Sequence, residues 1–280
     1  MVVDFHIHLF PQRVRENRGF FCSSDAGFAS LYNSPKARMA SEADIVAYLD
    51  QCGIDRGVVF GFPWESPELV KINNDEIWDF HEKTGGRIIP FAVVSCTDIA
   101  SAHREAERTL KQGFAGLGEL AFYSWGWTIS LIESIQPILD VASHMKKPVL
   151  LHVNEPVGHT YPGKIRIDFE ALVKLIERNP SVEFVLAHFG GGLFVYTMMP
   201  EINAIFSNTY VDTAASPYLY DQRVFATACS LLGPQKIIFG SDYPLLSLPR
   251  YLKDLDLANI TADARAAILG GNAQRLLKIK

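Results

Sequence analysis

Apolar and polar positions alternate along the chain on two length scales. Short runs of β-branched, aliphatic and aromatic residues are followed by longer segments in which apolar residues recur at helical spacing. This cycle repeats about eight times, which predicts parallel strands joined by helices. Several runs are apolar on both faces, as expected for strands that helices cover. The predicted strands lie within residues 2–9, 56–62, 87–94, 114–120, 148–154, 183–189, 209–214 and 236–242.

Capping residues mark the ends of several predicted helices. Ser, Thr, Asp and Asn favour the start of a helix, and Gly favours the position just after its end. By this criterion Ser41, Asp98 and Asp168 each begin a helix. The last twenty residues read as two short helices broken at Gly270–Gly271.

Eight strand–helix units without a dividing linker favour a (β/α)8 TIM barrel over an open sheet, with residues 1–280 as a single domain. The first unit is unusual, because residues 10–40 separate its strand from its helix, far more than a typical connection. We call this segment the insert. In a barrel it lies on the C-terminal face, where active sites form. Its aromatic residues predict an ordered lid rather than a disordered loop: Phe20, Phe21, Phe28 and Tyr32.

Composition and charge narrow the function without identifying it. Hydrophobic residues make up 48% of the chain and charged residues 20%, as in ordinary globular proteins. The net charge of -5 argues against broad attraction to nucleic acid or to an anionic membrane. We expect a cytoplasmic protein, because no apolar run is long enough for a membrane span and no signal peptide precedes the first strand. Its cysteines are far apart and are expected to be reduced: Cys22, Cys52, Cys96 and Cys229.

Two histidines interrupt the first predicted strand. His6 and His8 are separated by one residue, so strand alternation places them on one face, opposite Phe5, Ile7 and Leu9. In a barrel that face can point inward near the mouth, where two imidazoles can share one cation. The pair alone is a weak signal, and its meaning depends on partners elsewhere in the chain.

Partners occur at matching positions of other strands. Each lies near the C-terminal end of an apolar run, where a buried polar group without a partner would be costly. Closure of a barrel pairs the eighth strand with the first and so brings Asp242 beside the two histidines. The combined set predicts a metal site at the mouth of the barrel. The additional candidate residues are Glu119, His152, His188 and Asp242.

The motifs "DFHIHLF", "HVNEPVGH", "LAHFGG", "FGSDYP" and "GNAQRLL" together resemble the amidohydrolase superfamily. The likeness is to its amidohydrolase-2 branch of metal-dependent hydrolases and decarboxylases, which includes aminocarboxymuconate-semialdehyde decarboxylase-like proteins. It implies a (β/α)8 barrel with a divalent ion, usually zinc, at the mouth. It implies that His6, His8 and Asp242 bind the first metal. His152 would complete a one-metal site or serve a second metal, and His188 would be a ligand of the second metal or a neighbouring catalytic imidazole.

Glu119 departs from the pattern of many amidohydrolases, which carry a carboxylated lysine at the end of the fourth strand. The strand here reads "GLGEL" and is similar to the glutamate-bridged sites of TatD-like nucleases. A glutamate could hold two cations or lie against one. The alternative is a carboxylate that is only hydrogen-bonded at the barrel mouth.

The leading hypothesis is hydrolysis of an ester, lactone or amide bond in a small, carboxylated molecule. One or two Zn²⁺ ions, with Mn²⁺ as an alternative, would lower the pKa of a bound water to about 7. Asp242 would take the proton of this water, and His188 would polarise the substrate carbonyl.

Two loops supply candidate substrate contacts. His159, Tyr161 and Lys164 follow the fifth predicted strand, and Lys164 could hold a carboxylate. Tyr123 and Trp125 follow the fourth predicted strand and could wall a pocket for a flat substrate. The alternatives are a solvated loop in the first case and aromatic packing beneath a loop in the second.

Other reactions use the same residues. The nearest rival is metal-dependent, non-oxidative decarboxylation of an unsaturated or aromatic carboxylic acid. One branch of such decarboxylases has Glu-x-His on the first strand, whereas this chain has His-x-His, which disfavours that branch alone. A TatD-like phosphodiesterase is less favoured, since the chain has no basic stripe. The expected partner is therefore a small-molecule substrate, without nucleic acid or membrane, and a homodimer remains open.

Overall fold

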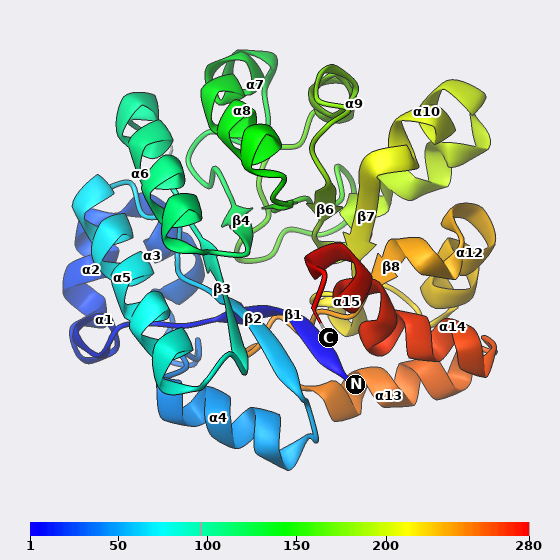
Figure 1. Ribbon diagram of the computed structural model, residues 1–280, viewed down its shortest axis with the longest axis horizontal. Helices are drawn as coiled ribbons and strands as arrows, with labels where there is room; N and C mark the ends of the chain where they lie inside the picture. The colour runs from blue at the N-terminus through cyan, green and yellow to red at the C-terminus, as the bar shows by residue number, and fades with distance from the viewer. Residues whose placement is uncertain (96, 280) are drawn as a thin grey trace.

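Eight parallel strands form one sheet in the order β1 to β8, and helices surround it (Figure 1). The computed structural model describes residues 1–95 and 97–279. Every predicted strand range contains an observed strand, so the predicted (β/α)8 barrel is confirmed. The strands are β1 (Val3–His8), β2 (Arg56–Phe60), β3 (Ile88–Ala92), β4 (Gly116–Leu120), β5 (Val149–Leu151), β6 (Phe184–Leu186), β7 (Thr209–Asp212) and β8 (Ile237–Ile238).

The helices between the strands follow the predicted capping residues. Ser41, Asp98 and Asp168 each accept a hydrogen bond from a backbone N–H in the first turn of the helix that they precede. The α-helices are α1 (Gln12–Glu16), α2 (Arg18–Ser24), α3 (Ala26–Tyr32), α4 (Glu42–Gln51), α5 (Pro67–Lys83), α6 (Ile99–Gln112), α7 (Ile129–Ser134), α8 (Gln136–Met145), α9 (Phe169–Arg178), α10 (Pro200–Ile205), α11 (Ser216–Leu219), α12 (Arg223–Leu232), α13 (Leu248–Leu257), α14 (Ala262–Ala266) and α15 (Asn272–Leu277).

Backbone hydrogen bonds join the segment after β8 to β1 and close the ring of strands. The N–H of Phe5 donates to the carbonyl of Phe239 at 2.9 Å, and the N–H of His8 donates to the carbonyl of Tyr243 at 2.8 Å. The second bond fixes the residue that follows Asp242 against the strand that carries both N-terminal histidines. Closure therefore brings Asp242 and His8 together, although the two residues are far apart in the sequence.

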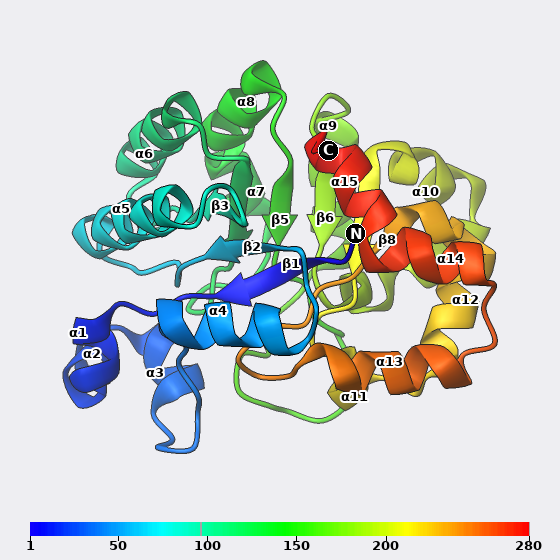
Figure 2. The ribbon, with the colours of Figure 1, turned by 60° about the horizontal axis from the view of Figure 1, so that its bottom comes forward.

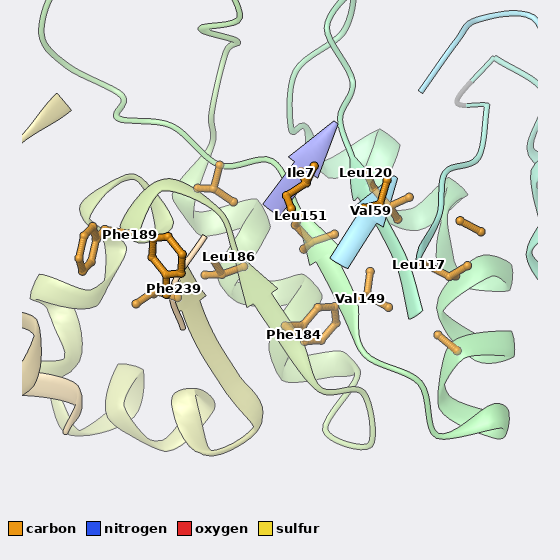
Figure 3. Packing of buried hydrophobic residues seen from close by; sticks show 14 of the residues in the cluster. Ile7, Val59, Leu117, Leu120, Val149, Leu151, Phe184, Leu186, Phe189 and Phe239 are labelled. Carbon is orange, nitrogen blue, oxygen red and sulfur yellow. The ribbon is translucent and has the colours of Figure 1, made fainter. Parts of the chain in front are cut away.

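Alternate residues of the strands face two buried apolar clusters. Val58, Phe60 and Leu150 belong to the cluster inside the barrel, whereas Val59 and Leu151 belong to the cluster between sheet and helices. Figure 3 shows part of the cluster between sheet and helices at close range.

Phe5 does not follow the predicted alternation. The pairing register between β1 and β2 shifts between Asp4 and Ile7. Because of this irregularity, Phe5 packs inside the barrel with its ring centroid 5.3 Å from that of Phe91, while Ile7 and Leu9 face the helices. The prediction was right for Ile7 and Leu9 and wrong for Phe5.

The insert is folded and contains the helices α1, α2 and α3, which lie beyond the arrowhead of β1 (Figure 2). One oxygen of Asp25 caps α3 at the N–H of Phe28, 2.8 Å away, and the other accepts from the N–H of Glu65, 2.9 Å away. Phe28 is completely buried, whereas Phe20 is 69% exposed. Of the predicted lid aromatics, Phe20 therefore points to solvent.

The final helices do not break at the glycine pair. The chain passes from α14 through one π-helical turn, Ala267–Gly271, directly into α15. A Cβ atom on Gly270 would collide with the carbonyl oxygen of Met1, so this position needs glycine for close approach of the N-terminal segment. Figure 1 shows the N-terminus beside these C-terminal helices.

Two further observations concern expectations about the cellular setting. Cys22, Cys52 and Cys229 carry free thiols, and Cys96 lies outside the described residues. Across residues 1–95 and 97–279, no helix has the length and apolar character needed to traverse a bilayer.

Candidate metal centre

The ends of five strands bring the six predicted donor residues together. β1 carries His6 and His8, and β4 carries Glu119. The other donors come just after β5, β6 and β8, and all six are largely shielded from water, with the side chain of Asp242 the most exposed at 15%. The remaining donors are His152, His188 and Asp242.

The first donor set surrounds the two histidines of β1. The Nε2 atoms of His6 and His8 face each other at 3.3 Å. Oδ1 of Asp242 lies 3.1 Å from Nε2 of His8 and 3.6 Å from Nε2 of His6. Oε2 of Glu119 lies 3.7 Å from Nε2 of His6. Two imidazole nitrogens and two carboxylate oxygens therefore converge on one small region.

A second donor set uses the other oxygen of Glu119. Its Oε1 atom lies 2.9 Å from Nδ1 of His152 and 3.6 Å from Nε2 of His188. The two imidazole nitrogens are 3.3 Å apart. Glu119 thus divides its oxygens between two pairs of histidines, which is the arrangement of a carboxylate that can bridge two cations.

Three of the four imidazoles are oriented by a hydrogen bond at the ring nitrogen that faces away from the cluster. Nδ1 of His6 donates to Oδ2 of Asp212 at 2.8 Å. Nε2 of His152 donates to the carbonyl of Gly163 at 3.0 Å, and Nδ1 of His188 donates to the carbonyl of Ala214 at 2.9 Å. Because these oxygens only accept, a neutral ring keeps its proton on the outer nitrogen. The lone pair of its other nitrogen then points toward the cluster.

His8 differs from the other three histidines. Its Nδ1 atom is buried and has no hydrogen-bond partner among the described residues. Its ring packs edge-on against Phe60, with centroids 4.8 Å apart. His8 is therefore oriented by packing and by Asp242 rather than by an outer acceptor.

Asp212 is a functional candidate that the sequence analysis missed. Besides holding His6, it accepts from the backbone N–H groups of His188 and Ala214 at 2.8 and 3.0 Å through its Oδ1 atom. It lies at the end of β7, a polar residue closing an apolar run in "TYVDTA". The same strand-end signal that identified Glu119 could therefore have identified Asp212.

The buried carboxylates make the centre strongly attractive to positive charge. Burial by itself would raise the pKa of Glu119, but His152 and His6 outweigh it and lower that pKa to about 2. Likewise, burial would raise the pKa of Asp242, but its hydrogen bond with His8 and the charge of His6 hold it well below its usual range. Burial would lower the pKa of His6, but the charges of Glu119 and Asp212 raise it to about 10.

The donor set fits a divalent ion. Protons on the histidines can balance the carboxylates, but a cation bound to the inward lone pairs supplies the same charge directly. Neutral imidazole with carboxylate suits zinc and manganese alike. Two groups, one of His6, His8 and Glu119 and one of Glu119, His152 and His188, each have ligand atoms within 4.8 Å of one another.

A family model described as amidohydrolase matches residues 3–279. The chain belongs to the amidohydrolase family. The resemblance seen in the sequence motifs is thereby confirmed, and the match spans all the strands that carry the donor residues.

Solved structures with the same fold share low sequence identity with this chain. A 5-carboxyvanillate decarboxylase from Sphingomonas paucimobilis is 17% identical, with a TM-score of 0.81 and coverage of 100% of this chain and 99% of that chain. A 5-carboxyvanillate decarboxylase from Novosphingobium aromaticivorans, complexed with manganese and 4-hydroxy-3-methoxy-5-nitrobenzoic acid, is 16% identical, with a TM-score of 0.77 and coverage of 100% and 96%. A dihydroxybenzoic acid decarboxylase from a Polaromonas species, with manganese and 2-nitroresorcinol, is 19% identical, with a TM-score of 0.74 and coverage of 99% and 96%.

The names of these neighbours describe decarboxylases, which is the reaction that the sequence analysis gave as its alternative to hydrolysis. At this identity the likeness concerns the fold. No curated protein sequence matches the chain.

The predicted substrate contacts lie at different places around the mouth. The ring of Tyr123 is 5.4 Å from that of His152 and stacks on Phe62. Trp125 is 58% exposed, and His159 is also exposed. Nζ of Lys164 donates to the carbonyls of Val157 and His159 at 2.5 and 3.0 Å, so its ammonium group is already engaged within its own loop.

The insert reaches the loops around the donor residues. A Cβ on Gly27 would lie 3.0 Å from Cβ of Tyr123, and a Cβ on Gly163 would lie 3.1 Å from Leu31. Tyr32, at the end of α3, packs against Phe10 with ring centroids 4.8 Å apart. Burial, followed by the charges of Asp242 and Glu119, raises the pKa of Tyr32 above its usual range. Its phenol therefore stays protonated near the centre.

Proposed function

We propose that the chain is a metal-dependent decarboxylase that removes CO₂ from a small unsaturated or aromatic carboxylic acid. The observation that carries this proposal is the full-length fold likeness to three decarboxylases whose names describe aromatic carboxylic acid substrates. The convergent nitrogen and oxygen donors at the strand ends agree with such chemistry. Fold alone does not define activity, so the reaction itself is the point to test.

We assign the first cation to His6, His8, Asp242 and Glu119. Zinc was the expected ion, whereas two of the solved neighbours contain manganese, so both ions belong in the assay. When bound, a divalent ion holds oxygen atoms of the substrate and stabilises negative charge that develops during the reaction.

Decarboxylation requires one proton from the protein. The bond between the substrate carbon and its carboxylate carbon breaks, the electron pair stays on the substrate carbon, CO₂ leaves, and a proton joins that carbon. Asp242 is a poor source, because its lowered pKa keeps it ionised near neutral pH. We assign the proton to Nε2 of His188 in the doubly protonated ring, because the neutral ring carries its single proton on Nδ1, which donates to the carbonyl of Ala214 at 2.9 Å.

Hydrolysis of an ester, lactone or amide remains the second candidate, and one specific observation favours it. The division of the Glu119 oxygens between two histidine pairs provides donors for two cations. With His188 used as a ligand of the second cation, Asp242 would accept the proton of the attacking water. The number of bound cations therefore separates the two chemistries.

A paired assay tests the proposal. Chain loaded with Mn²⁺ or Zn²⁺ is incubated with a panel of hydroxylated benzoic acids and unsaturated acids, and released CO₂ is measured. A parallel panel of lactones and esters is followed by proton release, with and without chelator. The proposal expects chelator-sensitive CO₂ release and at most weak hydrolysis. Chelator-sensitive hydrolysis without CO₂ from any acid would instead support the second candidate.

A further inference from the structure

The segment that carries Asp242 has little strand structure to support it. β8 is only two residues long, and backbone N–H groups of β1 donate to the carbonyls of Phe239 and Tyr243 beyond its end. Between these two points, the N–H of Ser241 donates to a side chain, to Oδ1 of Asp4, at 2.9 Å. A carboxylate of β1 therefore takes the place of a backbone acceptor next to a candidate metal ligand.

Asp4 is completely buried and holds both sides of this contact. Its Oδ1 atom also accepts from the N–H of His6 at 3.1 Å, so one oxygen joins the backbone of His6 to the residue before Asp242. Its Oδ2 atom accepts from the hydroxyl of Tyr48 at 2.8 Å. A Cβ on Gly240 would lie 2.7 Å from Cβ of His6, so the two segments are in close contact. Both oxygens of Asp4 thus find their partners within the protein.

The backbone of Asp242 gives these bonds a purpose. Its φ angle is 61°, in the left-handed region that residues other than glycine seldom adopt. Such a conformation persists where the surrounding contacts determine it. Here the contacts act on Ser241, whose N–H is held by Asp4 and whose carbonyl accepts from the hydroxyl of Tyr251 at 2.8 Å. Its Oγ atom accepts from the N–H of Tyr243 at 3.0 Å and so connects the two neighbours of Asp242.

We propose that Asp4 is a positioning residue of the metal centre, which holds the backbone of His6 and the turn at Asp242 so that both side chains meet at one cation. Asp4 acts through two backbone N–H groups and not as a ligand. Its role differs from that of Asp212, which holds the ring of His6. This inference rests on the metal centre of the proposed function and not on the reaction.

Titration of metal-free protein with Co²⁺ tests the role without requiring turnover, because the visible absorption of this ion reports the geometry of its ligands. Asp4→Ala removes the acceptor of both N–H groups. We expect the affinity for Co²⁺ to fall by about tenfold or more and the absorption spectrum of the bound ion to change. In Asp4→Asn, the amide oxygen can accept both bonds while the NH₂ group donates to the oxygen of Tyr48. We expect this variant to recover an affinity within about threefold of the wild type, and the wild-type spectrum.

Tyr48→Phe separates positioning from stability. It leaves Oδ2 of Asp4 buried without its donor, which destabilises the fold, but it keeps the acceptor of both N–H groups. We expect a lower melting temperature, an affinity within about threefold of the wild type and an unchanged spectrum. Asp254→Ala removes another buried carboxylate, one that pairs with Arg250 on α13, and should likewise leave the spectrum unchanged. A merely structural role of Asp4 would make Asp4→Ala behave like these two controls.

A measurement on the unaltered chain covers the case in which Asp4→Ala does not fold. NMR follows hydrogen exchange at the N–H of Ser241 in metal-free protein and after addition of Zn²⁺, which is diamagnetic. Because the bond to Asp4 prepares the turn before a cation binds, we expect slow exchange in both states. Fast exchange of this N–H in folded, metal-free protein would overturn the proposal. A folded Asp4→Ala variant with the affinity and spectrum of the wild type would do the same.

The outcome is distinguishable from that of the decarboxylation assay. The expected order of the variants, without CO₂ release from any acid, would support the role of Asp4 and count against decarboxylation. Release of CO₂ by a wild type whose Co²⁺ affinity is unaffected by Asp4→Ala would do the reverse. A wild type that binds no Co²⁺ would overturn the metal centre and the role of Asp4 together.

Discussion

At the scale of single residues, the centre depends on which nitrogen each imidazole turns inward. Asp212 fixes the choice for His6, and the carbonyls of Gly163 and Ala214 fix it for His152 and His188. Outer acceptors of this kind orient a ligand and raise its basicity. The donors are therefore arranged for a cation before one binds.

Removing the acceptor for His6 should weaken metal binding. In Asp212→Asn, the ring loses a charged acceptor, and we expect the affinity for Mn²⁺ or Zn²⁺ to fall by about 10- to 100-fold. Competition with a chromophoric chelator measures the dissociation constant. Asp221→Asn, an exposed change of the same type, serves as control and should leave it unaltered. Equal affinities for wild type and Asp212→Asn would show that the hydrogen bond between His6 and Asp212 does not contribute to metal binding.

The sequence could identify the six donors because each polar side chain ends an apolar strand. It could not show that Asp212 holds His6, since the two residues are 206 positions apart and only the observed strand register brings them together. The misplacement of Phe5 has a similar cause. The register shift between Asp4 and Ile7 depends on pairing with β2, and periodicity within one strand contains no information about it.

At the scale of elements, the insert is joined to the barrel by aromatic packing. The ring centroid of Phe28 lies 5.3 Å from that of Phe62 and 4.6 Å from that of Trp64, which both follow β2. Within the insert, it lies 4.8 Å from that of Tyr32. The aromatic content predicted order, but the sequence did not reveal three short helices. Such short helices are specified by their contacts with the barrel rather than by their own periodicity.

Truncation of Phe28 should therefore destabilise the whole domain. Phe28 is completely buried, so Phe28→Ala should lower the free energy of unfolding by about 3 kcal/mol or more. Phe20→Ala, in the same insert but 69% exposed, should change it by less than about 0.5 kcal/mol. Urea unfolding measures both. A small effect of Phe28→Ala would mean that the insert unfolds independently of the barrel.

The start of α4 gives a pH-dependent prediction. Asp44 accepts from Oγ and N–H of Ser41 at 2.6 and 2.9 Å, and these bonds lower the pKa of Asp44 below 3.8. This stabilisation is present above the unfolded pKa and is lost as pH falls through the lower folded value. Ser41→Ala should cost about 1 kcal/mol at pH 7, and its difference from wild type should shrink below about pH 3.8. Urea titrations across this range would contradict the account if the difference stayed constant.

At the scale of the whole molecule, barrel closure turns residues from both ends of the sequence into one centre. The alternation of strands and helices predicted this architecture, because each unit repeats the same simple pattern. The π-helical turn near the C-terminus was not foreseen, since the need for glycine at Gly270 arises from contact with Met1 at the other end of the chain. Contacts between distant segments thus account for what the sequence did not show.

A cation bridging several strands should stabilise the barrel as a unit. A ligand that binds only the folded chain adds about 2.7 kcal/mol at one hundred times its dissociation constant. We expect chelator-treated protein to melt at a lower temperature, and Mn²⁺ or Zn²⁺ to restore the original value. His6→Ala should abolish the metal-dependent rise. Differential scanning calorimetry that shows an equal rise in this variant would place the stabilising ion elsewhere.

Anomalous diffraction from crystals of the Mn²⁺-loaded chain tests the central claim most directly, because it locates the ion. The account predicts a manganese peak within bonding distance of Nε2 of His6, Nε2 of His8 and Oδ1 of Asp242. A second peak between Glu119, His152 and His188 would favour hydrolysis over decarboxylation. Crystals of fully loaded protein with no peak beside His6 and His8 would contradict the account.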